Sequence, residues 1–287
     1  IRRTESRLRG ALAADTKLFT LYGAMAFQAQ RAAIQPVREG RKVVLATSIA
    51  ETSLTIEGIR IVVDAGLARR AEFDAGSGMS RLVTTRVTKA EATQRAGRAG
   101  RLAPGVCYKL WTKGEDGALP AFPPAEIEVA DLTGFALDLA QWGAQPQDLG
   151  FLTPPHPGRL EEARSVLRML GALDAAHRIT AHGRALAGYP LHPRLAHMLE
   201  KGGKTAPDLA MILSEPDFLR GFSTELLHRV AALKDPERFQ REHGVDIPQQ
   251  TIRRLKQEAR RIARRTTGNG IDTVAVLTAL AYPDRVA

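Results

Sequence analysis

The sequence predicts an α/β domain followed by a mostly helical region, and three features indicate this arrangement. Short apolar runs at 43–46 and 60–64 are typical of buried strands. A stretch rich in glycine and proline, at 114–124, follows Trp111 and marks a domain boundary. From Asp131 onward, apolar residues recur at helical spacing. With 287 residues, of which 44% are hydrophobic, the chain is long enough to form two or three domains.

The first of these strands, at 43–46, ends in hydroxyl side chains and leads into a helical segment. Ser48 is expected to cap that segment, because Glu51 follows three residues later as in a capping box. Hydroxyl groups and the amides of a helix start are well suited to phosphate oxygens at the carboxyl end of a strand. The segment therefore predicts a phosphate-facing edge of the sheet.

The next strand, at 60–64, is also expected to be buried, and residues 69–86 predict a β-hairpin with strands at 70–73 and 81–85. The glycines of its turn do not form a dinucleotide-binding fingerprint, because the third glycine is absent and the segment does not join a strand to a helix. The hairpin is either a projection that contacts a ligand or a plain edge of the sheet.

The helix that follows the hairpin is predicted to begin with a capping box, formed by Thr88 and Glu91, and to end near Gly100. Small residues at 96–97 and 99–100 let another surface approach this helix closely. We therefore expect the helix to pack against the rest of its domain, although a solvated cationic helix is the alternative.

Four polar side chains of this helix form two groups that point in different directions. At about 100° per residue, Gln94, Arg98 and Arg101 fall within roughly 60° of one another. These three predict an anion-binding face, because planar guanidinium groups suit phosphate oxygens. Arg95 points about 100° away from Gln94 and is expected to serve packing or an internal ion pair.

In the helical region, the segment 251–265 predicts a strongly basic helix. It contains seven lysine and arginine residues and one glutamate. Its apolar residues are expected to point inward: Ile252, Leu255, Ala259 and Ile262. Its charged face is open to two interpretations, a contact with nucleic acid or a partner, and a solvated surface.

Charge is distributed unevenly along the chain. Residues 1–117 carry 20 lysine and arginine residues against 11 aspartate and glutamate residues, and so hold +9 of the net charge of +10. A single cysteine, Cys107, rules out an internal disulfide and suits a cytoplasmic protein. No apolar run approaches the ~18 residues of a membrane span, and the seven histidines show no metal-binding spacing. Neither membrane binding nor a metal site is predicted.

Three segments resemble motifs of the DEAH/RHA-type superfamily 2 helicases, in the order in which that family carries them. Residues 21–34 are similar to motif IVa, residues 43–56 to motif V, and the QRAGRAGR run at 94–101 to motif VI. The closing segment 280–286 resembles the bacterial HrpB branch. The resemblance implies a P-loop NTPase-like, RecA-like α/β domain with a parallel sheet, followed by a mostly α winged-helix domain and a helical bundle. The implied domains are an incomplete second RecA-like domain at 1–117, a winged helix at 118–188 and a ratchet-like bundle at 189–287.

The resemblance also implies the functional residues. The expected catalytic residues are Gln94, Arg98 and Arg101. The expected nucleotide-binding residues are these three together with Ser53, Thr55 and Glu57. The expected nucleic-acid-binding residues are Thr47, Ser48, Ser53, Arg70 and Arg81.

On the same resemblance, we expect part of an ATP-dependent RNA helicase that couples ATP hydrolysis to movement along single-stranded nucleic acid. The sequence contains neither a Gly-x-x-x-x-Gly-Lys-Ser/Thr loop nor a DEAH box, and Gly-Gly-Lys-Thr at 202–205 lacks the first glycine of such a loop. The chain is therefore expected to be an internal fragment, inactive alone, whose partner is the first RecA-like domain of the same protein. That domain is expected to supply the Mg²⁺ ligands. The alternative is a non-catalytic nucleic-acid-binding module with a winged helix.

Overall fold

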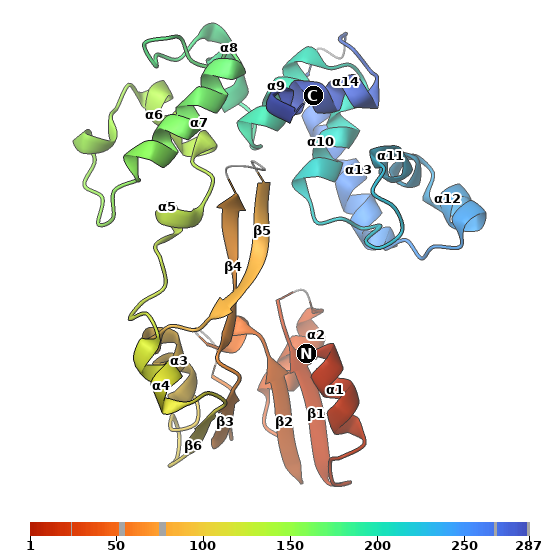
Figure 1. The fold of residues 1–287 in the computed structure, drawn as a ribbon. Coiled ribbons are helices and arrows are strands. Elements are labelled where there is room, and N and C mark those ends of the chain that lie inside the picture. Colours follow the sequence, from red (N-terminus) through yellow and green to blue (C-terminus); the bar gives the residue numbers. More distant parts are fainter. Residues whose placement is uncertain (24, 52–54, 75–78, 267–268, 286–287) are drawn as a thin grey trace. The chain divides into compact units, whose positions relative to one another are not determined.

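The computed structural model describes residues 1–23, 25–51, 55–74, 79–266 and 269–285. The chain divides into two compact units, Ile1–Ala130 and Asp131–Ala287, which are coloured red to yellow and green to blue in Figure 1. The first unit is α/β and the second is helical, which confirms the predicted fold class.

The first unit is built from three pairs of strands and short helices within its described residues. Its elements are, in chain order, α1 (Arg2–Arg9), β1 (Thr16–Leu21), α2 (Phe27–Ile34), β2 (Arg41–Ala46), the 3₁₀ turn η1 (Ser48–Ala50), β3 (Ile61–Asp64), β4 (Leu67–Asp74), β5 (Met79–Arg86), α3 (Lys89–Ala96), β6 (Val106–Lys109), α4 (Lys113–Ala118) and α5 (Glu126–Val129).

β1 and β2 form a parallel pair, with Leu18 beside Val43 and Leu21 beside Ala46. α1 and α2 pack against β1, and Leu21 is completely buried. The strand predicted at 43–46 is therefore confirmed. Because β2 ends at Ala46, the segment that follows it starts from the carboxyl end of a parallel pair, where phosphate-binding groups commonly lie.

β3 pairs in parallel with β6, so that Ile61 lies beside Val106 and Val63 beside Tyr108. Ile61 and Val63 are each 62% exposed, and the prediction that this strand is buried is therefore wrong for one of its faces. Successive residues of a strand point to opposite faces. α3 contacts β3 and covers the face that bears Asp64, which is 4% exposed.

β4 and β5 form the predicted hairpin, drawn in Figure 1 as a long two-stranded ribbon. They pair antiparallel, from Leu67 opposite Arg86 to Asp74 opposite Met79. Of the turn predicted at 74–78, Asp74 belongs to β4 and residues 75–78 lie outside the described residues. The hairpin is thus confirmed as a regular ribbon, and its tip is not described.

A small apolar cluster closes the base of this hairpin. Ala68 and Val87, at the two strand ends, pack with Ala92 of α3 and Trp111. Gly66 precedes β4 with a φ of +70°, and a Cβ atom there would lie 2.8 Å from the Trp111 ring. Only glycine satisfies both conditions, so the entry into β4 depends on this residue.

The second unit is helical in its described residues. Its elements are α6 (Thr133–Trp142), η2 (Pro146–Asp148), α7 (Pro157–Met169), α8 (Ala181–Ala187), α9 (Pro193–Lys201), α10 (Ala206–Ser214), α11 (Leu226–Lys234), α12 (Pro236–His243), α13 (Gln249–Ala263), α14 (Val274–Ala281) and η3 (Pro283–Arg285). The predicted basic helix is α13, and the four apolar residues expected to point inward are all buried. No helix in the described part of the chain is long and apolar enough to cross a membrane.

The start of α6 is linked to the start of α9 by a carboxylate–imidazole contact. Oδ2 of Asp131 lies 3.0 Å from Nε2 of His192, and its Oδ1 accepts a hydrogen bond from the backbone of Thr133 at 2.7 Å. Burial alone would raise the pKa of Asp131, but the bonds from His192 and Thr133 outweigh it and lower that pKa to about 2. The ionised carboxylate therefore stabilises the folded unit.

We expect Asp131→Asn to remove a pH-dependent part of the stability. Because the pKa of Asp131 is lowered by folding, its contribution is complete above about pH 5 and is lost as the pH falls toward about 2. When the pH is lowered from about 5 to about 2, the decrease in the free energy of unfolding should be about 1 to 2 kcal/mol smaller in Asp131→Asn than in the wild type. Chemical denaturation at several pH values measures this. Asp138→Asn, an exposed site on the same helix, is the control, and identical pH dependence in all three proteins would contradict the prediction.

Candidate functional site

α3 begins with the predicted capping box, which the structure confirms. Oε2 of Glu91 accepts hydrogen bonds from the backbone nitrogen of Thr88 at 2.7 Å and from its hydroxyl at 2.9 Å. The same hydroxyl accepts from the backbone nitrogen of Glu91 at 3.3 Å. Thr88 is 1% exposed, so the direction in which α3 leaves the hairpin is fixed by buried hydrogen bonds.

α3 is shorter than predicted. It spans Lys89–Ala96 with Gly97 at its end, so the prediction that it continues to Gly100 is wrong. The backbone nitrogen of Arg98 bonds to the carbonyl three residues back, at 3.1 Å, as in a tightened final turn. The two glycines explain the early end, because each costs a helix about 1 kcal/mol relative to alanine. Arg98 and Arg101 therefore lie beyond the helix, and the helical angle between them and Gln94 does not apply.

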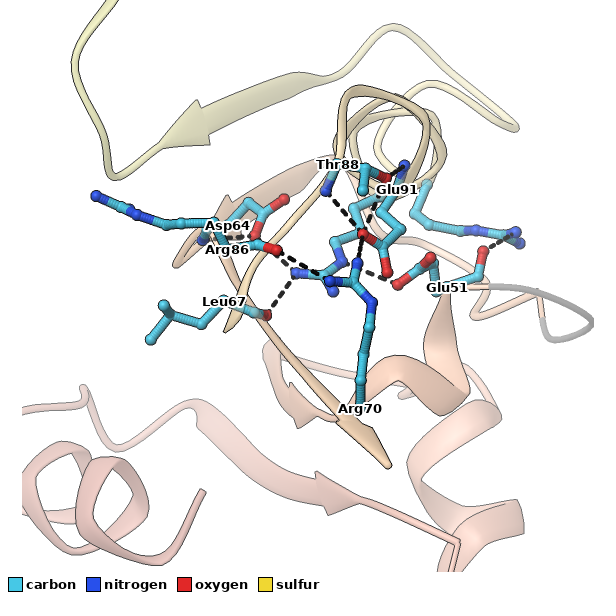
Figure 2. Close-up of polar contacts among 10 residues, drawn as sticks. Glu51, Asp64, Leu67, Arg70, Arg86, Thr88 and Glu91 are labelled. Atoms are coloured by element: carbon cyan, nitrogen blue, oxygen red, sulfur yellow. Dashed lines mark hydrogen bonds and ion pairs between the residues drawn. The ribbon is translucent and has the colours of Figure 1, made fainter. Parts of the chain in front are cut away.

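Arg95 lies at the centre of an internal ion-pair network, and its partners Glu51 and Asp64 are labelled in Figure 2. Its Nε is 3.0 Å from Oε2 of Glu51, and its Nη1 is 3.1 Å from Oδ1 of Asp64. Nη1 also donates to the carbonyl of Leu67 at 3.0 Å. Burial would lower the pKa of Arg95, but the two carboxylates outweigh this effect and raise it. The predicted internal ion pair is confirmed.

The two carboxylates that hold Arg95 are absent from the predicted site residues. The capping box expected between Ser48 and Glu51 is wrong, since Thr47 occupies the cap position of η1 and the Glu51 carboxylate bonds Arg95 instead. Asp64 has a sequence signal, a carboxylate at the carboxyl end of a strand next to a glycine turn. Its Oδ1 accepts from Arg95, whereas its buried Oδ2 has no hydrogen-bond partner within the described residues.

Two more arginines contact the segment that follows β2. Arg98 donates from Nη2 to the backbone carbonyl of Glu51, and Arg101 donates from Nη1 to the hydroxyl of Thr55 at 3.0 Å. The turn after α3 is thereby held against the turn after β2. Arg101 and Thr55, both predicted to bind nucleotide, are thus in direct contact, and Arg98 bonds the same segment at Glu51.

The other predicted residues of these two segments that the structure describes lie at the surface. Gln94 is exposed on α3, and Glu57 is exposed beyond Thr55. Thr47 and Ser48 are exposed directly after β2. Ser53 falls outside the described residues. The exposed hydroxyls and the exposed amide are accessible to a ligand, and their roles stay predictions.

The two hairpin arginines differ in their surroundings. Arg70 has a side chain that is 17% exposed, and its Nη2 lies 2.5 Å from Oε2 of Glu91. Its Nη1 donates to the hydroxyl of Thr85 at 2.8 Å. Arg81, by contrast, is exposed on β5. Internal contacts thus hold Arg70, whereas Arg81 is presented to solvent.

The Gly-Gly-Lys-Thr run of the second unit is not arranged as a phosphate loop. The backbone nitrogen of Gly203 donates to the carbonyl of Ile271 at 2.8 Å, and that of Thr205 donates to Oδ1 of Asp272 at 2.6 Å. These amides are therefore used inside the protein. The described residues also contain no group of three or more histidine, cysteine, aspartate or glutamate side chains that could hold a metal ion.

The arrangement at the ends of β2 and α3 suits the binding of a polyanion. Arg98 and Arg101 provide planar forks that can form paired hydrogen bonds to phosphate oxygens. The hydroxyl of Thr55 lies beside one of them. Arg95 contributes by fixing the two segments, because its guanidinium group is already bonded to Glu51 and Asp64.

Comparisons with known proteins point to one family. Residues 2–103 match the family described as the helicase conserved C-terminal domain. The chain is 45% identical over 223 residues to the ATP-dependent RNA helicase HrpB of Escherichia coli (strain K12), a match that covers 75% of this chain and 27% of that protein. It is 37% identical over 198 residues to the pre-mRNA-splicing factor ATP-dependent RNA helicase prp22 of Schizosaccharomyces pombe (strain 972 / ATCC 24843), covering 68% of this chain and 17% of that protein.

The comparison with solved structures points to the same family. The crystal structure of the E. coli DExH-box NTPase HrpB matches 99% of this chain with a TM-score of 0.82 and 37% sequence identity. The match covers 34% of that chain. The chain thus spans about a third or less of the length of these relatives.

We expect Arg95→Gln to destabilise the first unit by about 3 kcal/mol, because it leaves the buried Asp64 carboxylate without its cationic partner. Arg9→Gln, which breaks an exposed pair with Glu5, is the matched control and should cost less than about 1 kcal/mol. Denaturant unfolding measures both changes. Equal losses from the two substitutions would show that the network around Arg95 adds nothing beyond an ordinary surface ion pair.

Proposed function

We propose that the protein is an ATP-dependent RNA helicase of the DEAH/RHA type, because residues 2–103 match the helicase conserved C-terminal domain and the chain is similar to HrpB in sequence and fold. In this proposal the chain supplies motifs IVa, V and VI, and ATP hydrolysis drives movement along single-stranded RNA. The observation that carries the proposal is the docking of Arg98 and Arg101 on Glu51 and Thr55.

The nucleotide lies, in this proposal, against the segments after β2 and α3. Gln94, Arg98 and Arg101 act on the terminal phosphate, the glutamine by placing the attacking water and the arginines by stabilising charge. Phosphoryl transfer requires chiefly positioning and electrostatic stabilisation, which these groups provide. Ser53, Thr55 and Glu57 complete the nucleotide site. The hydrogen bond between Arg101 and Thr55 supports a shared ligand, since the two groups already lie within contact.

Mg²⁺ would neutralise the charge of the ATP phosphates. We propose that its ligands belong to a P-loop and a DEAH box of the first RecA-like domain. The first RecA-like domain of the same protein would then form the other side of the ATP site.

The RNA strand is proposed to run past the carboxyl end of β2. The exposed hydroxyls of Thr47 and Ser48, together with Ser53, suit hydrogen bonds to backbone phosphates. Arg81 on β5 is exposed and able to add a cationic contact. Arg70 is held by Glu91 and Thr85, and we therefore assign it an internal role instead of the nucleic-acid contact expected from the sequence.

We propose a winged helix at 118–188, of which residues 118–130 belong to the first unit, and a helical bundle at 189–287 within the second unit. A cytoplasmic location is part of the same proposal. The competing function is a static nucleic-acid-binding module. ATP turnover by the full-length protein, measured with matched RNA and DNA strands as stimulants, separates the two, because a static module would hydrolyse no ATP with either strand.

In the full-length protein we expect Arg98→Lys or Arg101→Lys to reduce ATP turnover by about 10³-fold, because lysine keeps the charge but loses the planar fork. Nucleic-acid affinity without nucleotide should change little. Arg95→Lys should retain most activity where the protein stays folded, since Arg95 faces Glu51 and Asp64. Steady-state turnover and strand-binding titrations measure these effects. Loss of turnover in a folded Arg95→Lys protein, with full turnover in Arg98→Lys, would overturn the assignment.

We also expect the exposed face of α13 to contribute to strand binding. Arg260→Gln combined with Arg264→Gln should reduce the salt dependence of RNA affinity by up to about two counterions. The control pairs Arg238→Gln with Arg254→Gln, which changes the charge equally but removes arginines already bonded to Glu242 and Glu215. Salt titrations of RNA affinity measure both. An unchanged salt slope in the first variant would assign this face of α13 to solvent.

A further inference from the structure

One carboxylate oxygen joins the cap of α3 to the hairpin. Oε2 of Glu91 accepts from the backbone and hydroxyl of Thr88, at 2.7 and 2.9 Å, and from Nη2 of Arg70 at 2.5 Å. The side chains of Arg70 and Glu91 are 17% and 15% exposed. Burial raises the pKa of Glu91, but the bonds from Thr88 and Arg70 outweigh it and lower that pKa. The group is therefore a carboxylate at neutral pH.

Arg70 touches both strands of the hairpin as well as α3. Its backbone belongs to β4, and its Nη1 donates to the hydroxyl of Thr85 at 2.8 Å and to the carbonyl of Arg86 at 3.3 Å, both on β5. Figure 2 shows the Arg70 side chain pointing at Glu91. One guanidinium group thus ties β4 and β5 to the first turn of α3.

A second arginine links the same two elements, but its side chain belongs to α3 and its partner lies on β4. Arg95, near the end of α3, donates to the carbonyl of Leu67 at the start of β4. α3 is therefore bonded to β4 near both of its ends, by Arg70 at the first turn and by Arg95 at the last. Two well-separated links of this kind resist rotation as well as translation, so the helix and the base of the hairpin should move as one body.

We propose that Arg70 and Glu91 are positioning residues that transmit displacements of the motif VI segment to the β4–β5 hairpin. This proposal rests on the proposed helicase function. When the arginines that follow α3 engage and release the terminal phosphate of ATP, the force on them passes through the backbone to α3, whose Arg95 stays bonded to Glu51 and Asp64. The Arg70–Glu91 pair carries that force to the hairpin, whose exposed Arg81 is proposed to contact the nucleic acid. Hydrolysis without the pair would proceed but would be poorly converted into strand separation.

The substitution that isolates the pair is Glu91→Gln. Glutamine is an accepted residue at the third position of a capping box, so its amide oxygen can still cap α3 while the ionic attraction for Arg70 is lost. The chain offers a matched control in Glu115, which forms a second capping box with Thr112 and an ion pair with Arg86 of β5. That pair joins the hairpin to α4 and not to α3.

The experiment compares the full-length wild type, Glu91→Gln and Glu115→Gln for base pairs separated per ATP hydrolysed. We expect this ratio to fall about tenfold in Glu91→Gln and to stay within about twofold of wild type in Glu115→Gln, with stimulated ATP turnover changed less than about threefold in both. Arg70→Lys, which keeps the charge but loses the fork, should give an intermediate ratio.

A second readout does not depend on unwinding. Hydrogen exchange of the β4 and β5 amides should respond to a non-hydrolysable ATP analogue in the wild type and in Glu115→Gln, and lose that response in Glu91→Gln. A wild-type ratio and a wild-type exchange response in Glu91→Gln would overturn the coupling alone. A wild type without stimulated ATP turnover would instead overturn the proposed function. If Glu91→Gln lost ATP turnover and unwinding to the same extent, the Arg70–Glu91 pair would have only a structural role.

Discussion

The ion pairs that Arg95 forms with Glu51 and Asp64 are the interactions on which the first unit depends. They join the turn after β2, the end of β3 and the last turn of α3, which are distant in the sequence. Burying three charges costs several kcal/mol for each ion, and the cost is offset only when good geometry and further hydrogen bonds satisfy the groups. The guanidinium group meets that condition by bonding the carbonyl of Leu67 as well.

Two arginines of the site, Arg95 and Arg101, therefore differ in their freedom to move. Arg95 is bound by two carboxylates, and each charge-assisted bond is about twice as strong as a neutral one. Arg101 is exposed and bonds the neutral hydroxyl of Thr55, a contact worth about 1 kcal/mol. A phosphate oxygen can replace that hydroxyl but not the carboxylates of Glu51 and Asp64. Arg95 thus fixes the structure of the site, whereas Arg101 is able to bind the ligand.

Local patterns allowed several features to be predicted from the sequence. The capping box of Thr88 and Glu91, the strands of the hairpin and the buried face of α13 all follow from spacings of a few residues, and the structure confirms them. The internal position of Arg95 also followed from helical geometry. That inference held because Gln94 and Arg95 both lie inside α3, where 100° per residue applies.

The errors arise where a partner distant in the sequence decides the outcome. Glu51 has the spacing of a capping residue for Ser48, but a buried arginine offers it a stronger bond. Likewise, the contact of Arg70 with Glu91, 2.5 Å away on α3, could not be predicted from the sequence of the hairpin alone. The end of α3 was misplaced because the glycine at 97 already weakens the helix. Short-range rules describe caps and strands, whereas ion pairs depend on how the elements pack.

The central claim is that Arg95 stays fixed while Arg98 and Arg101 engage the terminal phosphate. A crystal structure of the full-length protein with Mg²⁺, ADP and aluminium fluoride, which imitates the phosphoryl group in transfer, tests it most directly. The account predicts that Arg101 leaves Thr55 for the fluoride ligands, while Arg95 remains within hydrogen-bond distance of Glu51 and Asp64. An Arg95 side chain in contact with the nucleotide, or an Arg101 still bonded to Thr55, would contradict it.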